Sequence, residues 1–271
     1  MRPRLIEDDV TMDDARITQA AEILWRGRLE CRRMATLPAE CRPQTLDEGY
    51  AIQDAMVPLA GQAVAGWKIA ATSAAGQRHI GVDEPLGGRL FADFVLGDGA
   101  LLPASPLHMR VAEAEFAFRL GRDLQGGAAP YDMVAVCDAV AELYLAIEIP
   151  DARFERFDEA GPAQIAADDA YASWFVLGPR VANWRSVDLA RHPVQAIKNG
   201  KLAREGSGAN VLGDPRTALT WLVNDRIKRG GGLKAGDVIT TGTCVKPLEI
   251  AGGDRVIADF GHLGQVSVNF I

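Results

Sequence analysis

The stretch VAEAEFAFRL, residues 111–120, decides how this chain folds. Successive side chains of a strand point to opposite faces of a sheet, so its second, fourth, sixth, eighth and tenth residues form one apolar face that should pack on a core. The other face carries Glu113 and Glu115, with Cα atoms about 7 Å apart. Adjacent carboxylates repel unless a proton, a basic side chain or a metal ion lies between them. A solvent-exposed strand with two ordinary glutamates is the alternative.

A second apolar segment, LYLAIEI at 143–149, carries the single carboxylate Glu148. A buried acid needs a partner. A third carboxylate beside Glu113 and Glu115 would complete an all-oxygen site suited to Mg²⁺ or Mn²⁺. Periodicity alone leaves open whether the three side chains meet.

The N-terminal sequence predicts two helices. Apolar residues recur at helical spacing over 11–36. A second helix is expected at 45–59, where Thr45 and Glu48 resemble a capping box.

From residue 64 onward the pattern changes to short β-like runs, interrupted by helices expected at 131–142 and 215–229. Asp214 is the expected N-cap of the later helix, and Asn199–Gly200 is typical of a hairpin turn. The runs lie at 64–70, 111–120, 143–149, 173–178, 194–200, 237–242, 255–260 and 265–270. This order predicts an α+β fold, a largely β body with helices packed outside.

The composition excludes several function classes. The 271 residues carry a net charge of −7, which argues against nucleic acid or an anionic membrane as partner. The four cysteines lack zinc-site spacing, so we expect free thiols in the cytoplasm. The first residues, MRPRLIEDDV, lack the apolar core of a signal peptide, and no run approaches the roughly 20 apolar residues of a membrane span. Phosphate-loop, dinucleotide, nucleophile-elbow and HExxH motifs are missing from the sequence.

Six motifs occur in an order that resembles the 2-keto-4-pentenoate hydratase and 4-oxalocrotonate decarboxylase group of the fumarylacetoacetate hydrolase superfamily. The resemblance covers roughly residues 15–271. The motifs are WKIAATS (67–73), GVDEPLGGRLFADFV (81–95), AEAEFAFRLGRDL (112–124), AIEIPDARF (146–154), ADDAYASWFVLG (167–178) and GSGANVLGDPRTALTWL (206–222).

The resemblance implies a mostly β body wrapped around Mg²⁺ or Mn²⁺, with Glu113, Glu115 and Glu148 as ligands. It assigns catalytic roles to Lys68 and Asp83, whereas residue type alone would suggest a surface lysine and a turn aspartate. It also implies a homo-oligomer. We accordingly expect a helical N-terminal part at 1–62 and a β-rich metal-binding catalytic domain at 63–271.

The activity implied by the resemblance is metal-dependent addition of water to a 2-hydroxy-2,4-dienoate or 2-keto-4-enoate acid, in the catabolism of aromatic-type compounds. The carboxylate and 2-oxo oxygens of such keto or enol acids can chelate a metal that stabilises enolate charge. The alternatives are decarboxylation of a 4-oxalocrotonate-like keto-diacid and C–C hydrolysis of an acylpyruvate. A non-catalytic keto-acid-binding or partner subunit is a further alternative.

The segment ADDAYAS (167–173) departs from the family pattern ADNASSG. Asp169 replaces an amide, and Tyr171 replaces a small hydroxyl residue. Because this segment usually lines the family's substrate pocket, the changes bear on the substrate tail and on the reaction. Tyr171 is expected either to contact the substrate or to be a core aromatic.

Three further residues complete the expected substrate contacts, namely Ser73, Thr243 and Arg153. Arg153 could bind a substrate carboxylate through two hydrogen bonds. An ion pair between Arg153 and Asp151, or another acid, is the alternative.

Overall fold

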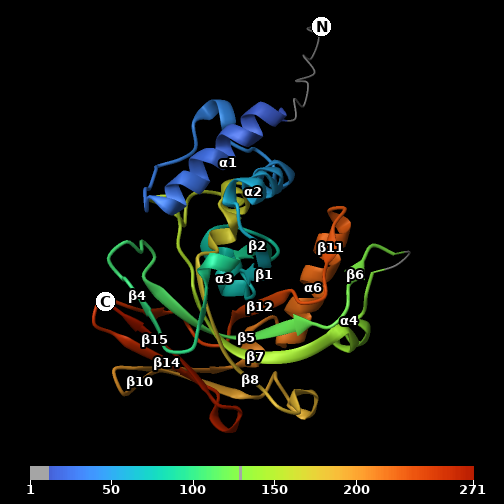
Figure 1. Ribbon diagram of the computed structural model, residues 1–271, viewed down its shortest axis with the longest axis vertical. Helices are drawn as coiled ribbons and strands as arrows, with labels where there is room; N and C mark the ends of the chain where they lie inside the picture. Colours follow the sequence, from blue (N-terminus) through green and yellow to red (C-terminus); the bar gives the residue numbers. More distant parts are fainter. Residues whose placement is uncertain (1–11, 128–129) are drawn as a thin grey trace, which may run out of the picture.

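The computed structural model describes residues 12–127 and 130–271. Helices α1 and α2 lie at one end of the molecule, and the strands of two sheets form the body beneath them (Figure 1). The α+β class, with a β body and a smaller helical N-terminal part, is confirmed. In the described part of the chain, no helix is both long and apolar enough to cross a bilayer. The segment MRPRLIEDDV, which was not expected to be a signal peptide, lies outside the described residues.

Helix α1 (Asp14–Leu29) is shorter than the helix expected at 11–36. It begins after Asp13, whose side chain accepts from the backbone N–H of Arg16. The prediction is wrong beyond Leu29, because the chain turns at Cys31, which has a left-handed φ of 52°. Residue 11 lies outside the described ranges.

Helix α2 (Leu46–Ala60) begins as expected. Thr45 accepts from the N–H of Glu48, and the side chain of Glu48 returns to the backbone of Thr45, which confirms the capping box. The buried side of α2 packs against α1 and against the short helix α5 (Pro162–Ala167).

The main sheet has eight strands in the order β2-β1-β12-β5-β7-β8-β3, and β13 pairs with β5 off this path. Its strands are β1 (Val64–Ala70), β2 (Leu86–Phe91), β3 (Val95–Gly97), β5 (Val111–Leu120), β7 (Val140–Ile149), β8 (Trp174–Arg180), β12 (Val238–Thr243) and β13 (Leu248–Glu249). Strand β7 starts earlier than the expected 143.

The second sheet has the order β10-β9-β14-β15-β4, and a short pair joins β11 to β6. The hairpin at Asn199–Gly200 is confirmed, since both residues have positive φ, 53° and 77°, and Lys198 pairs with Lys201. The five strands of the second sheet are β4 (Ala100–Leu102), β9 (Pro193–Lys198), β10 (Lys201–Ser207), β14 (Arg255–Asp259) and β15 (Gln265–Phe270). The short pair consists of β6 (Leu124–Gln125) and β11 (Gly232–Leu233).

Besides α5, three α-helices connect strands of the body in the described part of the chain. Helix α6 (Pro215–Lys228) begins at the expected N-cap, Asp214. Helix α4 (Met133–Ala139) is shorter than predicted, because the chain enters β7 at Val140. Helix α3 (Ala74–Ile80) was not expected from the sequence and has no buried residue.

The apolar face of β5 packs into the main hydrophobic core, as expected from its alternation. That core continues across β7 and β15 to α6. The β5 residues in it are Ala112, Ala114, Phe116, Phe118 and Leu120. The division of the chain at residues 62 and 63 stays a prediction.

Candidate metal centre

The three glutamates predicted as metal ligands meet in space. Antiparallel pairing of β5 with β7 sets Glu113 directly opposite Glu148. Each of Glu113, Glu115 and Glu148 offers one carboxylate oxygen, and these oxygens lie within 4.8 Å of one another. The strand register therefore supplies the convergence that periodicity left open.

The carboxylates lie in a poorly hydrated environment. Glu115 and Glu148 are almost fully buried, while Glu113 is half-buried. Burial and the charge of Glu148 raise the pKa of Glu113 to about 7. Burial and the neighbouring glutamates also raise the pKa of Glu115, and burial raises that of Glu148. These raised pKa values reflect the cost of holding three negative charges together in a buried site.

One oxygen of Glu115 is fixed and the other is unused. Its Oε2 accepts from the backbone N–H of Gly242 at 2.7 Å and from the hydroxyl of Thr240. Its Oε1 is buried and has no hydrogen-bond partner among the described residues. A buried oxygen without a donor is costly. A hard divalent cation fits this donor set, because carboxylate oxygens are its preferred ligands.

Lys68 on β1 completes the cluster. Its Nζ lies 3.0 Å from Glu148 Oε1 and donates to the carbonyl of Ala170 at 3.0 Å. Burial on its own would lower the pKa of Lys68, but Glu148 and the other two glutamates raise it above the usual value. The lysine is therefore a buried cation facing three carboxylates, and the surface-lysine alternative is wrong.

The Ala170 carbonyl comes from an unusual turn. Asp169, Ala170 and Tyr171 have left-handed φ values of 56°, 50° and 62°. A left-handed conformation costs a non-glycine residue roughly 1–2 kcal/mol, so the turn needs support from its surroundings. Asp169 supplies it, because its Oδ1 accepts from the backbone N–H of Arg89 at 2.6 Å and its Oδ2 from Arg28 at 3.0 Å.

Arg28 is a site residue that the sequence did not reveal. Its guanidinium also donates to the carbonyl of Ala172 at 2.8 Å and stacks on the rings of Trp25 and Phe91. Arg28 lies 141 positions before Asp169. The aspartate in place of the family's amide was the one available signal, since a buried carboxylate requires a cationic partner.

Three expected substrate contacts are engaged in hydrogen bonds within the chain. The Ser73 hydroxyl caps α3 by accepting from the N–H of Gly76 at 3.1 Å. Thr243, opposite Glu115 in the sheet, donates to a main-chain carbonyl of its own turn. Tyr171 is buried and donates to the carbonyl of Phe157 at 2.7 Å.

The two remaining predicted site residues are Arg153, which is paired with a carboxylate, and Asp83, which is exposed. The buried guanidinium of Arg153 forms an ion pair with Asp168 and donates to its carbonyl at 2.8 Å. Arg153 thus forms the ion pair with an acid that was the alternative to binding a substrate carboxylate, and the acid is Asp168 instead of Asp151. Asp83 is exposed between α3 and β2, and its side chain has no hydrogen bond or ion pair in the described part of the chain.

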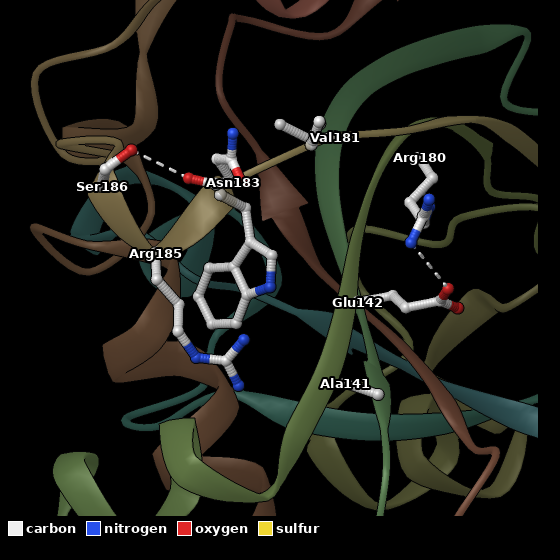
Figure 2. Close-up of a pocket in the computed structure, with 9 residues that line it drawn as sticks. Ala141, Glu142, Arg180, Val181, Asn183, Arg185 and Ser186 are labelled. Atoms are coloured by element: carbon white, nitrogen blue, oxygen red, sulfur yellow. Dashed lines mark hydrogen bonds and ion pairs between the residues drawn. The ribbon is translucent and has the colours of Figure 1, made fainter.

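A large cavity of about 590 Å³ is not the carboxylate site. It lies at the other end of β7, where Glu142 pairs with Arg180 (Figure 2). Glu142 and Glu148 are separated by about 20 Å of extended strand.

Comparisons with known proteins agree with the resemblance seen in the sequence. The model of the family described as "Fumarylacetoacetate (FAA) hydrolase C-terminal" matches residues 82–270. A 2-keto-4-pentenoate hydratase of Burkholderia vietnamiensis is 33% identical over 95% of this chain and 98% of its own. A 2-hydroxyhexa-2,4-dienoate hydratase of Comamonas testosteroni is 33% identical over 91% and 94%.

A solved structure matches over almost the whole fold. It is a 4-oxalocrotonate decarboxylase from Pseudomonas putida G7 complexed with magnesium and adipate. The TM-score is 0.89 at 28% identity, with 96% of this chain and 99% of that chain covered. The resemblance drawn from the six motifs is confirmed.

Proposed function

Since this chain belongs to the fumarylacetoacetate hydrolase family, we propose that it is a divalent-metal-dependent lyase that adds water to a 2-keto-4-enoate acid through its 2-hydroxy-2,4-dienoate form. It is an enzyme of the hydratase type. The convergence of Glu113, Glu115 and Glu148 beside Lys68 carries the proposal. The names of the hydratase relatives support the substrate class, and catabolism of aromatic-type compounds is the proposed setting.

The proposed cofactor is Mg²⁺ or Mn²⁺, held by Glu113, Glu115 and Glu148. The unpartnered Oε1 of Glu115 and the close approach of the three carboxylates support this assignment. When bound, such a cation polarises the 2-oxo oxygen of the substrate and stabilises enolate charge.

Lys68 is proposed to act as a fixed countercharge and hydrogen-bond donor. In the metal-free fold the three glutamates raise its pKa, which favours the charged ammonium. Contacts with Glu148 and the Ala170 carbonyl hold the ammonium beside the carboxylate cluster. The ammonium would stabilise negative charge that develops on an enolate.

The remaining predicted site residues are proposed to serve catalysis or to contact the substrate. Asp83 is proposed as the second catalytic group, and its exposure leaves it free to reach a substrate. Ser73 and Thr243 are proposed to line the substrate, the latter because it pairs with Glu115. Tyr171 and Arg153 are proposed substrate contacts, and each already donates to a partner within the chain.

A second candidate reaction is decarboxylation of a 4-oxalocrotonate-like keto-diacid. The fold match to a 4-oxalocrotonate decarboxylase favours it specifically. C–C hydrolysis of an acylpyruvate and non-catalytic keto-acid binding are the remaining alternatives. All of these would use the same carboxylate cluster.

Mass balance separates these reactions. Purified protein would be incubated with 2-hydroxypenta-2,4-dienoate, with Mg²⁺, with Mn²⁺ or with EDTA, and the products analysed by mass spectrometry. The hydratase proposal expects metal-dependent gain of one water. If this substrate is not consumed, a keto-diacid and an acylpyruvate are tested next. Loss of CO₂ would then favour the decarboxylase, two fragments the hydrolase, and binding without turnover a non-catalytic subunit.

The chain is further proposed to work as a cytoplasmic homo-oligomer. The four free cysteines, Cys31, Cys41, Cys137 and Cys244, support a reducing compartment. Light scattering of the purified protein would give the number of subunits.

A further inference from the structure

A second cavity lies between the C-terminal end of α1 and the β body. Its volume is about 310 Å³. Phe94 and Trp174, whose ring centroids are 4.9 Å apart, form part of its wall together with Leu107. The cavity therefore offers apolar surface to a ligand and is near the lower size limit of ordinary small-molecule sites, about 300 Å³.

Four arginines line the same cavity, and three of them are paired with carboxylates. Arg28 pairs with Asp169, Arg153 with Asp168 and Arg32 with Glu30.

The fourth arginine, Arg33, has no carboxylate partner among the described residues. It donates to the carbonyl of Pro106, and its Nε is buried without a hydrogen-bond acceptor in the described part of the chain. Leaving a buried guanidinium N–H unpaired is unfavourable.

Asp151, the one described acid on the cavity lining, does not act as the acceptor for Arg33. Its Oδ1 accepts from the backbone N–H groups of His108 and Met109, at 2.6 Å and 2.9 Å. The cavity thus combines apolar walls with one guanidinium that pairs with no described carboxylate.

We propose that this cavity binds a small organic acid with an apolar body and that Arg33 pairs with its carboxylate. A carboxylate supplies the acceptor that Arg33 Nε lacks, and charge-assisted hydrogen bonds of this kind are short and strong. The apolar body packs on Phe94 and Trp174. This site needs no metal ion.

The lining of the proposed site includes none of the three glutamates and not Lys68, but contacts between residues connect the two sites. Arg28 lines the cavity and also holds Asp169. The next residue, Ala170, accepts from Lys68 of the carboxylate cluster. A chain of contacts through Arg28, the Asp169–Ala170 turn and Lys68 therefore connects the two sites.

The test is calorimetric titration of benzoate into the full-length protein in EDTA. Wild type should bind at submillimolar to millimolar concentration, and Arg33→Met should bind about tenfold more weakly or worse, because it loses a charge-assisted pair. Arg16→Met, which removes the same charge from the first turn of α1, should leave the affinity unchanged. Absence of binding to wild type, or equal binding by wild type and Arg33→Met, would overturn the proposal.

Two additional measurements separate this cavity from the metal centre and from a subunit interface. Oxalate with Mg²⁺ should occupy a carboxylate-held metal centre and leave benzoate binding intact; displacement of benzoate would mean that it binds at that centre, against the proposal. Light scattering of Arg33→Met should match wild type, whereas a change in subunit number would mark the cavity as an interface between copies. Because no turnover is measured, failure of the hydratase proposal would not affect these outcomes.

Discussion

Glu115 contains the buried oxygen that most directly indicates a cation site. Replacing Glu115 with Gln removes one negative charge and one ligand while preserving shape, so we expect Mn²⁺ affinity to fall about tenfold or more. Calorimetric titration of Mn²⁺ would measure it. Glu142→Gln is the matched control, since Glu142 is on the same sheet but pairs with Arg119 and Arg180. Equal Mn²⁺ affinity in Glu115→Gln and wild type would refute the metal assignment.

Lys68 should separate catalysis from metal binding. Lys68→Met keeps the length of the side chain but removes the ammonium from three carboxylates. We expect turnover to fall on the order of 100-fold, the usual cost of losing one preorganised charge donor. Mn²⁺ affinity should be kept or become tighter, because the remaining charge is more negative. Parallel loss of Mn²⁺ affinity and turnover in this variant would mean that Lys68 mainly supports the metal site.

The Arg28–Asp169 ion pair should show strong coupling between its members. Arg28→Met leaves a buried carboxylate without its cation, and we expect a loss of about 3 kcal/mol in the free energy of unfolding. Asp169→Asn restores neutrality beside Arg28→Met, so the double variant should recover much of that loss. Urea unfolding of the two single variants and the double variant measures the coupling energy. Simple additivity would show that the ion pair contributes little.

At the scale of elements, the strained turn depends on how closely β2 approaches it. A Cβ added at Gly88 would lie 2.2 Å from the carbonyl oxygen of Asp169, which forces the two segments apart. Gly88→Ala is therefore expected to destabilise the protein by about 1–3 kcal/mol and to lower activity by displacing the Ala170 carbonyl from Lys68. Thermal unfolding and turnover measure these effects.

Gly97→Ala on β3 is the control for the Gly88 variant. A Cβ at Gly97 meets no described atom within 4 Å. If Gly88→Ala matched Gly97→Ala in both stability and turnover, the close approach of β2 to the turn would not be important.

Elements with strong local signals were predictable from the sequence. Strands at 64–70, 111–120 and 265–270 have the expected bounds, because their alternation or apolar run is uninterrupted. Helix α2 has a capping box, and α6 has an N-cap followed by proline, so their starts are encoded locally.

Elements whose conformation depends on distant contacts were not predictable. Strand β2, LGGRLF, contains two glycines that weaken a strand pattern, although Gly88 is required there by the nearby Asp169. Nothing in the local sequence marks Ala170 as left-handed. The three glutamates and Lys68 were identified through residue type and family resemblance, but their convergence required the register between β5 and β7.

At the scale of the whole molecule, the helical N-terminal part and the β body share the turn beside Lys68. Arg28 of α1 binds Asp169 directly. Gln53 of α2 donates to the carbonyls of Gly87 and Ala166, on either side of the same region. The N-terminal helices therefore contribute buried polar contacts to the site as well as covering it.

The stability of the whole molecule should fall with rising pH in the absence of metal, and Mg²⁺ should counteract this fall. In the fold, pKa values are raised to about 7 for Glu113 and about 6 for Asp168, and are also raised for Glu115 and Glu148. A raised carboxyl pKa stabilises the fold fully below the unfolded value, and this contribution is lost as pH rises through the folded value. In EDTA, we therefore expect the melting temperature to fall by several degrees between about pH 5 and 8.

Excess Mg²⁺ should raise the melting temperature more at the upper end of this pH range, because the cation competes with protons for the three glutamates. Thermal unfolding across this range, with EDTA and with Mg²⁺, measures both effects. A melting temperature that rises with pH in EDTA, or an equal effect of Mg²⁺ at both ends, would mean that the glutamates are not protonated in the metal-free fold.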